Sequence, residues 1–349
     1  MPSEPIRIGL GVLCYNEEEG IADLIAGLAQ QDVFRDARFL TELLVVPNGC
    51  TDKTGDVAAK ALERHRDALT MRAGAIAAVK ETQEKGKAHA WNWLIHDLLA
   101  GRAPYVVLID ADIVFPGTTA IRKLIEGLQA NPTLKALSST PIKDLERKSD
   151  LSLTERIIVQ GGGTRDNKQG ICGQLYAARA EALSDLRLPR GLPVEDGFIA
   201  GMLNTDGFRH APQGQVISRA EGVEHLYESE RTIGGLLKHQ TRIVVGSAIN
   251  GHLFDHFRTL PPDRSRIAHV AAKEAQDERW VETLITNERT RLLVPSTFLT
   301  KRLQALARIR SLRDLKRLPA IIAGLGLDTI CYIQAWRRMR RPDRGLGHW

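Results

Sequence analysis

Short apolar runs alternate with longer helical stretches over the first 115 residues. The apolar runs have the length of strands and lie at residues 6–13, 43–46, 75–79 and 105–109. The stretches between them carry apolar residues at helical spacing and lie at residues 18–30, 54–68 and 87–99. This alternation predicts an α/β fold, in which a mostly parallel sheet carries helices on both faces.

The remaining sequence divides into a mixed lobe and a helical region. Candidate strands lie at residues 134–139 and 171–177, and Gly161-Gly162-Gly163 marks a flexible or closely approached backbone between them. From about residue 256 the sequence becomes mainly helical, and Pro261-Pro262-Asp263 is a suitable boundary turn. We therefore expect three parts, which are residues 1–115, 116–255 and 256–349.

The composition is that of an ordinary folded protein. Apolar residues make up 43% of the 349 and charged residues 26%, which argues against a disordered, collagen-like or multi-spanning membrane chain. The four cysteines lie far apart without a CxxC pair, a pattern typical of buried thiols in a reducing compartment. Nothing near the amino terminus is typical of a signal peptide. We expect a cytoplasmic protein.

Basic residues gather at the carboxyl end. Residues 300–349 hold twelve Lys and Arg against three Asp, whereas the whole chain has a net charge of only +6. A basic tail on a mildly acidic body indicates an anionic partner, either lipid head groups or nucleic acid. A solvated basic helical face explains the same charge pattern.

The stretch from residue 318 to residue 336 is apolar and flanked by basic residues. As a helix it would nearly cross a hydrocarbon core, but Asp328 near its centre costs roughly 2.5–3.5 kcal/mol on insertion. The pattern favours an amphipathic helix in the plane of a membrane, and a helix packed on the protein's own core is the alternative. We therefore expect an anionic membrane surface as partner, at the inner face of the plasma membrane, and no nucleic acid.

Polar segments follow the ends of the expected strands. They are Cys14–Glu18, Pro47–Asp52, Lys85–Lys87 and Asp110–Asp112. Ligands of parallel sheets bind at the carboxyl ends of the strands, so one ligand could touch all four segments. Asp110 and Asp112 offer the hard oxygen ligands that a divalent cation needs beside a diphosphate, although a DxD after a strand is about as often a turn or a helix cap.

Six segments in register resemble the inverting family 2 glycosyltransferases of the GT-A fold. They are Leu13–Glu18, Val46–Thr54, Lys85–Asn92, Asp110–Asp112, Gly173–Arg179 and Val194–Asp196. The resemblance implies a GT-A-like mixed, mostly parallel sheet flanked by helices, with a C-terminal helical appendage. Residues 1–115 would be the nucleotide-sugar-binding half and 116–255 the acceptor-binding and catalytic half. Residues 256–349 would be a basic helical region able to associate with a membrane.

The resemblance also assigns a donor site. It implies Tyr15, Glu17 and Asn48 at the base of a UDP- or GDP-sugar, and Lys87 along the donor. It further implies Asp110 at the ribose or sugar, with Asp112, and Asp110 beside it, holding Mg²⁺ or Mn²⁺. An Asn amide both donates and accepts hydrogen bonds, so uracil and guanine both stay open.

Catalytic roles follow from the same resemblance. Asp196 would be the general base that removes the proton of the attacking hydroxyl, and Glu195 would support it or bind the acceptor. A helix N-terminus rich in acids is the alternative for this pair. Arg242 would pair with the diphosphate. His225 would be either a third metal ligand or a hydrogen-bonded structural histidine.

The resemblance as a whole implies an inverting, metal-dependent glycosyltransferase with a hydroxyl acceptor, which the basic tail suggests is lipid-linked. Processive members have a Trp where this chain has Ile243, so we expect a non-processive enzyme. A sugar-1-phosphate nucleotidyltransferase has a similar sheet but needs a Gly-rich, Arg-containing loop where this chain has Cys14–Glu19. A catalytically silent sugar-nucleotide or lipid-binding protein is the third class, against which Asp112 and Asp196 argue.

Overall fold

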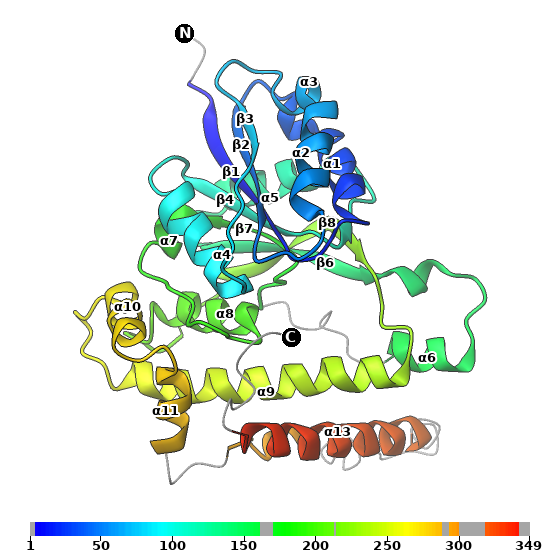
Figure 1. Cartoon of the computed structure of the whole chain (residues 1–349), viewed down its shortest axis with the longest axis vertical. Helices are drawn as coiled ribbons and strands as arrows, with labels where there is room; N and C mark the ends of the chain where they lie inside the picture. The colour runs from blue at the N-terminus through cyan, green and yellow to red at the C-terminus, as the bar shows by residue number, and fades with distance from the viewer. Residues whose placement is uncertain (1–3, 161–169, 213, 288–292, 300–317, 342–349) are drawn as a thin grey trace.

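An eight-stranded mixed sheet forms the centre of the molecule, with the strand order β3-β2-β1-β4-β7-β6-β8-β5 (Figure 1). The computed structural model describes residues 4–160, 170–212, 214–287, 293–299 and 318–341. The strands are β1 (Ile6–Cys14), β2 (Phe39–Pro47), β3 (Ile76–Val79), β4 (Tyr105–Asp110), β5 (Ile113–Val114), β6 (Ala136–Lys143), β7 (Leu175–Arg179) and β8 (Ile217–Tyr227). The predicted fold class, a mostly parallel sheet flanked by helices, is confirmed.

The amino-terminal half of the sheet is parallel and buried on both faces. Strand β1 pairs in parallel with β2 and β4, and β2 pairs in parallel with β3. Alternate residues of β1 such as Leu10 and Val12 pack under helices α1 (Ile21–Ala29), α2 (Thr54–Arg64) and α5 (Ala120–Ala130). On the other face α4 (Lys87–Trp93) and the short π-helix η2 (Leu94–Leu98) lie so close that a Cβ on Gly11 would come within 2.0 Å of Leu94 Cδ2. Glycine at this position therefore serves the packing of helix on strand.

The other half of the sheet is mixed. Strand β7 is antiparallel to both β4 and β6, β8 is parallel to β6, and the short β5 is antiparallel to β8. The first residues of the predicted strand 171–177 are a loop, and β7 begins at Leu175. Strand β8 was not predicted. Its pairing with β6 shifts register around Gly222, which has a φ of 65°, and this bulge breaks the alternation that marks a strand.

Shorter elements complete the body. They are η1 (Asp32–Phe34), α3 (Arg66–Leu69), η3 (Asp144–Arg147), α6 (Leu153–Gln160), α7 (Ala180–Leu183) and α8 (Glu195–Thr205). Gly161-Gly162-Gly163 lies outside the described residues.

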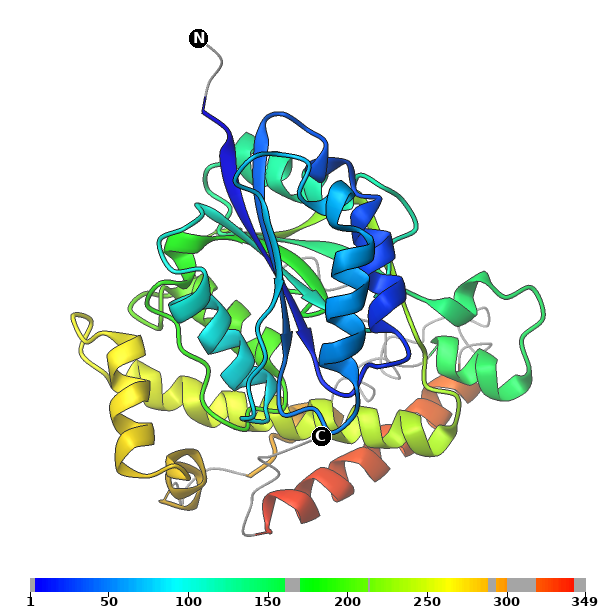
Figure 2. The ribbon, with the colours of Figure 1, turned by 45° about the horizontal axis from the view of Figure 1, so that its top comes forward.

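The carboxyl-terminal region is helical, as predicted. Its helices, within the described residues, include α9 (Ile233–Arg258), α10 (Arg266–Gln276), α11 (Trp280–Asn287) and α13 (Leu318–Met339). Helix α9 packs on α8 and adds Val245 and Ile249 to the core, and α13 runs along α9 on the side away from the sheet (Figures 1 and 2). The predicted boundary at residue 256 falls in the last turn of α9. None of the helices that the structure describes combines the length and the apolar character needed to cross a bilayer.

Candidate active site

The polar segments after the strands meet at one edge of the sheet. Backbone hydrogen bonds join the end of β2 to the end of β1, from Asn48 N to the carbonyl oxygen of Cys14, at 3.0 Å. The end of β4 is joined to the loop before β7, from Asp110 N to the carbonyl oxygen of Gln174, at 2.8 Å. The parallel topology thus brings distant motifs together, as the strand ends predict.

Two cavities share a wall of charged residues at this edge. The β1 cavity, of about 330 Å³, lies at the ends of β1 and β2 and is lined by Tyr15, Glu17, Asn48, Lys85 and Gly86 among others. The α9 cavity, of about 370 Å³, lies between β8 and α9 and is lined by Lys143, Glu228, Ser229, His239 and Gln240 among others. Their common wall consists of Lys87, Asp110, Asp112, Pro193, Glu195 and Arg242. Two ligands, one in each cavity, would meet at this wall.

Lys87 holds the common wall together. It begins α4, and its Nζ lies 2.7 Å from Asp110 Oδ1 and 2.6 Å from Glu195 Oε1. Burial disfavours the ionised form of Glu195, but the Lys87 ammonium outweighs it and lowers the pKa of Glu195. Burial raises the pKa of Asp110 to about 7, and the charges of Asp112 and Glu195 add to this against the opposing Lys87. The Lys87 ammonium therefore pairs with two carboxylates at once, and the common wall carries more negative than positive charge.

Asp196 lines the α9 cavity, in the first turn of α8. Burial and the charge of Glu195 raise the pKa of Asp196 to about 6. The loop before β7 packs tightly against it, because a Cβ on Gly173 would lie 3.2 Å from Asp196 Cβ. A carboxylate with a pKa near neutrality is suited to accept a proton from a bound hydroxyl.

The acidic side chains at the common wall fit a divalent cation. Among the described residues, Asp112 has neither a hydrogen-bond nor an ion-pair partner. Burial and the charge of Asp112 raise the pKa of Glu17 to about 7. No group of three His, Cys, Asp or Glu in the described part of the chain could hold a metal alone. The arrangement suits an ion such as Mg²⁺, which takes one or two carboxylates and completes its shell with phosphate and water oxygens.

His225 lies away from this wall. It is fully buried, with Nδ1 2.7 Å from Ser139 Oγ and Nε2 3.2 Å from Gln174 Oε1, and it lines neither cavity. Burial lowers the pKa of His225 to about 4. Both ring nitrogens are thus engaged inside the protein, so the predicted metal role of His225 finds no support here.

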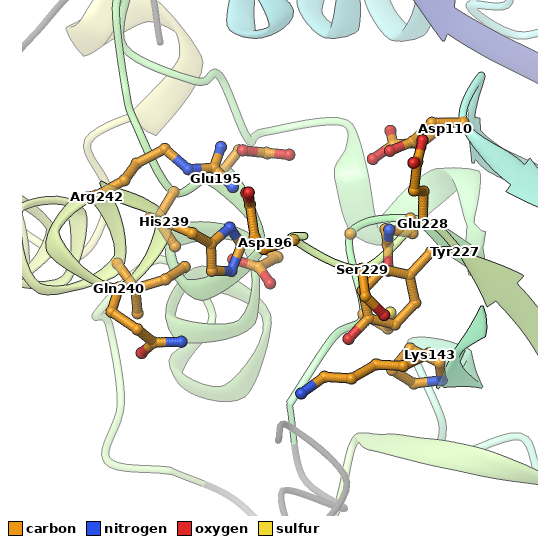
Figure 3. A pocket seen from close by; sticks show the side chains of 18 of the residues that line it. Asp110, Lys143, Glu195, Asp196, Tyr227, Glu228, Ser229, His239, Gln240 and Arg242 are labelled. Atoms are coloured by element: carbon orange, nitrogen blue, oxygen red, sulfur yellow. The ribbon is translucent and has the colours of Figure 1, made fainter. Parts of the chain in front are cut away.

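Glu228 lies at the site, although the sequence pattern did not point to it. It follows β8, lines the α9 cavity and contributes to the raised pKa of Glu17; Figure 3 shows it beside Asp110. Pairing of Tyr227 with Ile113 brings this end of β8 next to the Asp110–Asp112 segment. Sequence reasoning missed Glu228 because it missed β8.

Asn48 lines the β1 cavity, but its side-chain amide makes hydrogen bonds within the protein. Its side chain is 3% exposed, Nδ2 donates to the carbonyl oxygen of Cys14 at 2.7 Å, and Oδ1 accepts from Gly86 N at 3.2 Å. These bonds fix the walls of the β1 cavity. Tyr15 and Lys85 are more accessible there, with Lys85 Nζ 4.2 Å from the centre of the Tyr15 ring. Lys85 was visible in the Lys85–Lys87 segment but was not singled out.

Helix α9 supplies the opposite side of the α9 cavity. Arg242, His239 and Gln240 face Lys143, Tyr227 and Ser229 across it (Figure 3). Arg242 also reaches the β1 cavity, which is the position its predicted role at the diphosphate requires. Burial lowers the pKa of His239 to about 4, so this ring is neutral near pH 7.

Comparisons with known proteins gave similar solved structures and a family match. A mannosyltransferase from Pyrobaculum calidifontis, solved with GDP-Man and Mn²⁺, is 19% identical with a TM-score of 0.59, over 97% of this chain and 88% of that chain. Glucosyl-3-phosphoglycerate synthase from Mycobacterium tuberculosis, solved with Mg²⁺ and uridine diphosphate, is 18% identical with a TM-score of 0.44, over 73% of this chain and 80% of that chain. A search of curated proteins gave no match. The model of the glycosyl transferase family 2 matches residues 10–192, more than half of the sequence, and the chain therefore belongs to this family of glycosyltransferases.

Proposed function

We propose that the chain transfers a sugar from a UDP- or GDP-sugar to a hydroxyl acceptor, with inversion at the anomeric carbon. The observation that carries the proposal is the wall shared by the two cavities. The β1 cavity would take the nucleotide, the α9 cavity would take the acceptor, and the anomeric carbon would lie at the wall between them. Membership of the family argues against a sugar-1-phosphate nucleotidyltransferase.

The donor would be held from the strand ends. Tyr15 and Glu17 would contact the nucleoside, Lys87 and Arg242 would face the diphosphate, and Asn48 would keep the walls in place. Asp110 and Asp112 would hold Mg²⁺ or Mn²⁺. The Asp112 carboxylate, which has no hydrogen-bond or ion-pair partner among the described residues, supports this role. When bound, the cation would neutralise the charge of the departing nucleoside diphosphate. The mannosyltransferase solved with GDP-Man and Mn²⁺ supports the same choice of donor and metal.

Asp196 would act as the general base. As the acceptor oxygen forms its bond to the anomeric carbon, the bond to the diphosphate breaks, and the acceptor proton passes to the Asp196 carboxylate. Because Asp196 lines the α9 cavity and not the β1 cavity, it would approach from the acceptor side. A single displacement of this kind inverts the anomeric centre. Glu195, which forms an ion pair with Lys87, would keep the side chains of the common wall in position and would not exchange a proton.

The acceptor would be a lipid-linked hydroxyl, glycosylated once, at the cytoplasmic face of a membrane. Ile243 in place of a Trp supports single transfer, and the four free cysteines support a reducing compartment. A catalytically silent binding protein would not need a carboxylate whose pKa is raised by burial and by a neighbouring charge, as that of Asp196 is.

The proposal can be tested by donor screening followed by turnover. Thermal shift with UDP- and GDP-sugars should show one donor that raises the Tm only with Mn²⁺, because a ligand stabilises the folded state that binds it. That donor should then label a lipid-linked acceptor. Donor binding without transfer to any hydroxyl acceptor would support a silent binding protein, and the absence of any donor effect would contradict the assignment of the β1 cavity.

A further inference from the structure

Helix α13 presents an exposed apolar face. Eight large apolar side chains are exposed among the described residues, and four of them lie on this helix. They are Ile322 (56% exposed), Ile330 (46%), Ile333 (44%) and Trp336 (38%). Helical geometry places all four within about 120° of one another around the axis. A face of this kind on a surface helix marks an interaction site.

The opposite face of α13 packs on α9. Cys331, Ala335 and Met339 are buried there, and Thr241 Oγ1 of α9 donates to Gln334 Oε1 at 2.8 Å. Asp328, the only acidic residue of the helix, is half-buried and lies on this packed side. The exposed face is consequently free of acids, and the obstacle that Asp328 poses to membrane contact does not apply to it.

Arginines continue the exposed face at its carboxyl end. Arg337, Arg340 and Arg341 are exposed, and the guanidinium carbon of Arg340 lies 3.7 Å from the centre of the Trp336 ring. An aromatic ring beside cations is suited to the boundary between acyl chains and head groups. A second copy of α13 would offer these arginines no partner, because Asp328 is its only acid and lies on the packed side. The charge therefore favours anionic lipid over a dimer in which two α13 helices pair.

Helix α13 also lies on the other side of α9 from the α9 cavity. Leu237 and Thr241 of α9 contact α13, whereas His239, Gln240 and Arg242 from the same turns line the α9 cavity. Two helices, α13 and α9, each about 10 Å across, thus lie between the exposed face and this cavity. Figures 1 and 2 both show α9 between α13 and the sheet.

We propose that the α13 face formed by Ile322, Ile330, Ile333, Trp336 and the adjoining arginines docks on anionic lipid head groups. The helix lies in the plane of the membrane, with its apolar side chains among the acyl chains, and holds the α9 cavity about two helix diameters, roughly 20 Å, from the membrane surface. A hydroxyl on a lipid-linked acceptor that extends this far from the bilayer then reaches the cavity while its lipid stays in the membrane. This link to the acceptor rests on the proposed function, whereas the docking itself does not.

Vesicle binding by the full chain tests the docking. The protein should sediment with phosphatidylcholine vesicles that contain phosphatidylglycerol, and not with phosphatidylcholine alone, and high salt should release it. Ile330→Glu should lower the partition at least about ten-fold, and the double variant Arg337→Gln/Arg340→Gln about 30-fold. Met71→Glu changes an apolar residue away from α13 that is more exposed than Ile330 (59% against 46%), and this variant should bind as the wild type does.

Two further measurements separate the outcomes. The thermal shift caused by the donor should be the same in all variants, because none of them changes the β1 cavity. The vesicle assay does not depend on the donor, so its result holds even if the donor assignment is wrong. Sedimentation velocity should show a monomer. The docking proposal would be overturned if the wild-type protein did not bind anionic vesicles, or if Ile330→Glu and Met71→Glu lost vesicle binding equally. It would also be overturned by a dimer that Ile330→Glu dissociates, which would show that a second copy of the chain covers this face.

Discussion

Lys87 and Glu195 form an ion pair of 2.6 Å that joins the N-terminus of α4 to the N-terminus of α8. The two residues are 108 positions apart in the sequence, and both line the wall that the two cavities share. The same ammonium binds Asp110 at the end of β4. A single side chain therefore links the two cavities, and its loss should affect both stability and catalysis.

Lys87→Met should destabilise the fold by about 1–3 kcal/mol, because it leaves Asp110 and Glu195 close together without their common cation. Urea unfolding at pH 7 measures this. The loss should shrink at low pH, where the raised pKa of Asp110 allows that carboxyl to be protonated in the folded state. Lys85→Met, on the exposed side of the same loop, is the matched control and should keep wild-type stability. Equal effects of the two substitutions would contradict the role given to the bridge.

Gly11→Ala should destabilise the protein by about 1–3 kcal/mol, because the added methyl group would overlap Leu94, which packs under β1. Gly27→Ala is the control: Gly27 lies within α1, where the nearest atom to a new Cβ is 3.7 Å away, so the substitution should stabilise by about 0.5–1 kcal/mol. Denaturant midpoints of the two variants should shift in opposite directions. A neutral Gly11→Ala would show that Leu94 can move aside.

Residues near the start of the chain could be predicted well because each strand there is buried on both faces. A strand such as β1 reads as a continuous apolar run, and the polar residues after it, Tyr15 and Glu17, mark the edge where ligands bind. The positions of Asp110 and Asp112 followed from the same rule. Local sequence was sufficient for this half of the site.

The other half depends on contacts that local sequence does not encode. Strand β8 is interrupted at Gly222, so neither the strand nor Glu228 after it could be recognised. The burial of Asn48 and His225, which occupies their polar atoms, depends on tertiary neighbours. For α13, periodicity predicted a helix with an apolar face, but only the structure assigns Asp328 to the packed side.

Asp196→Asn should retain donor binding but lose transfer by about 10² or more, because the amide cannot accept the proton. For the wild type, kcat/KM should fall as the pH is lowered through about 6, the raised pKa of Asp196. The same raised pKa means that ionised Asp196 costs stability above pH 6, a cost that fades between pH 6 and pH 4 as the folded state takes up a proton. Asp196→Asn should therefore be more stable than the wild type at pH 7, and this advantage should shrink on acidification. A variant that is less stable at pH 7 would indicate a structural cap.

Asp112→Asn should abolish the metal dependence of donor binding and leave the fold intact. The substitution removes a charge from the hard-cation site at nearly constant volume, and Asp112 has no hydrogen-bond or ion-pair partner within the described part of the chain that it could lose. Calorimetric titration of the donor with and without Mn²⁺ measures this, and urea unfolding at pH 7 should give a midpoint no lower than that of the wild type, because the charge of Asp112 repels Glu17 and Asp110. Asp67→Asn, at an exposed position of α3, is the control for the change of charge alone and should bind donor and metal normally.

The Mn²⁺ dependence of donor binding in Glu228→Gln should lie between those of Asp112→Asn and Asp67→Asn if the Glu228 charge acts on the metal without coordinating it. A loss as complete as that of Asp112→Asn would make Glu228 a ligand. Undiminished Mn²⁺-dependent affinity in folded Asp112→Asn would move the cation away from the end of β4.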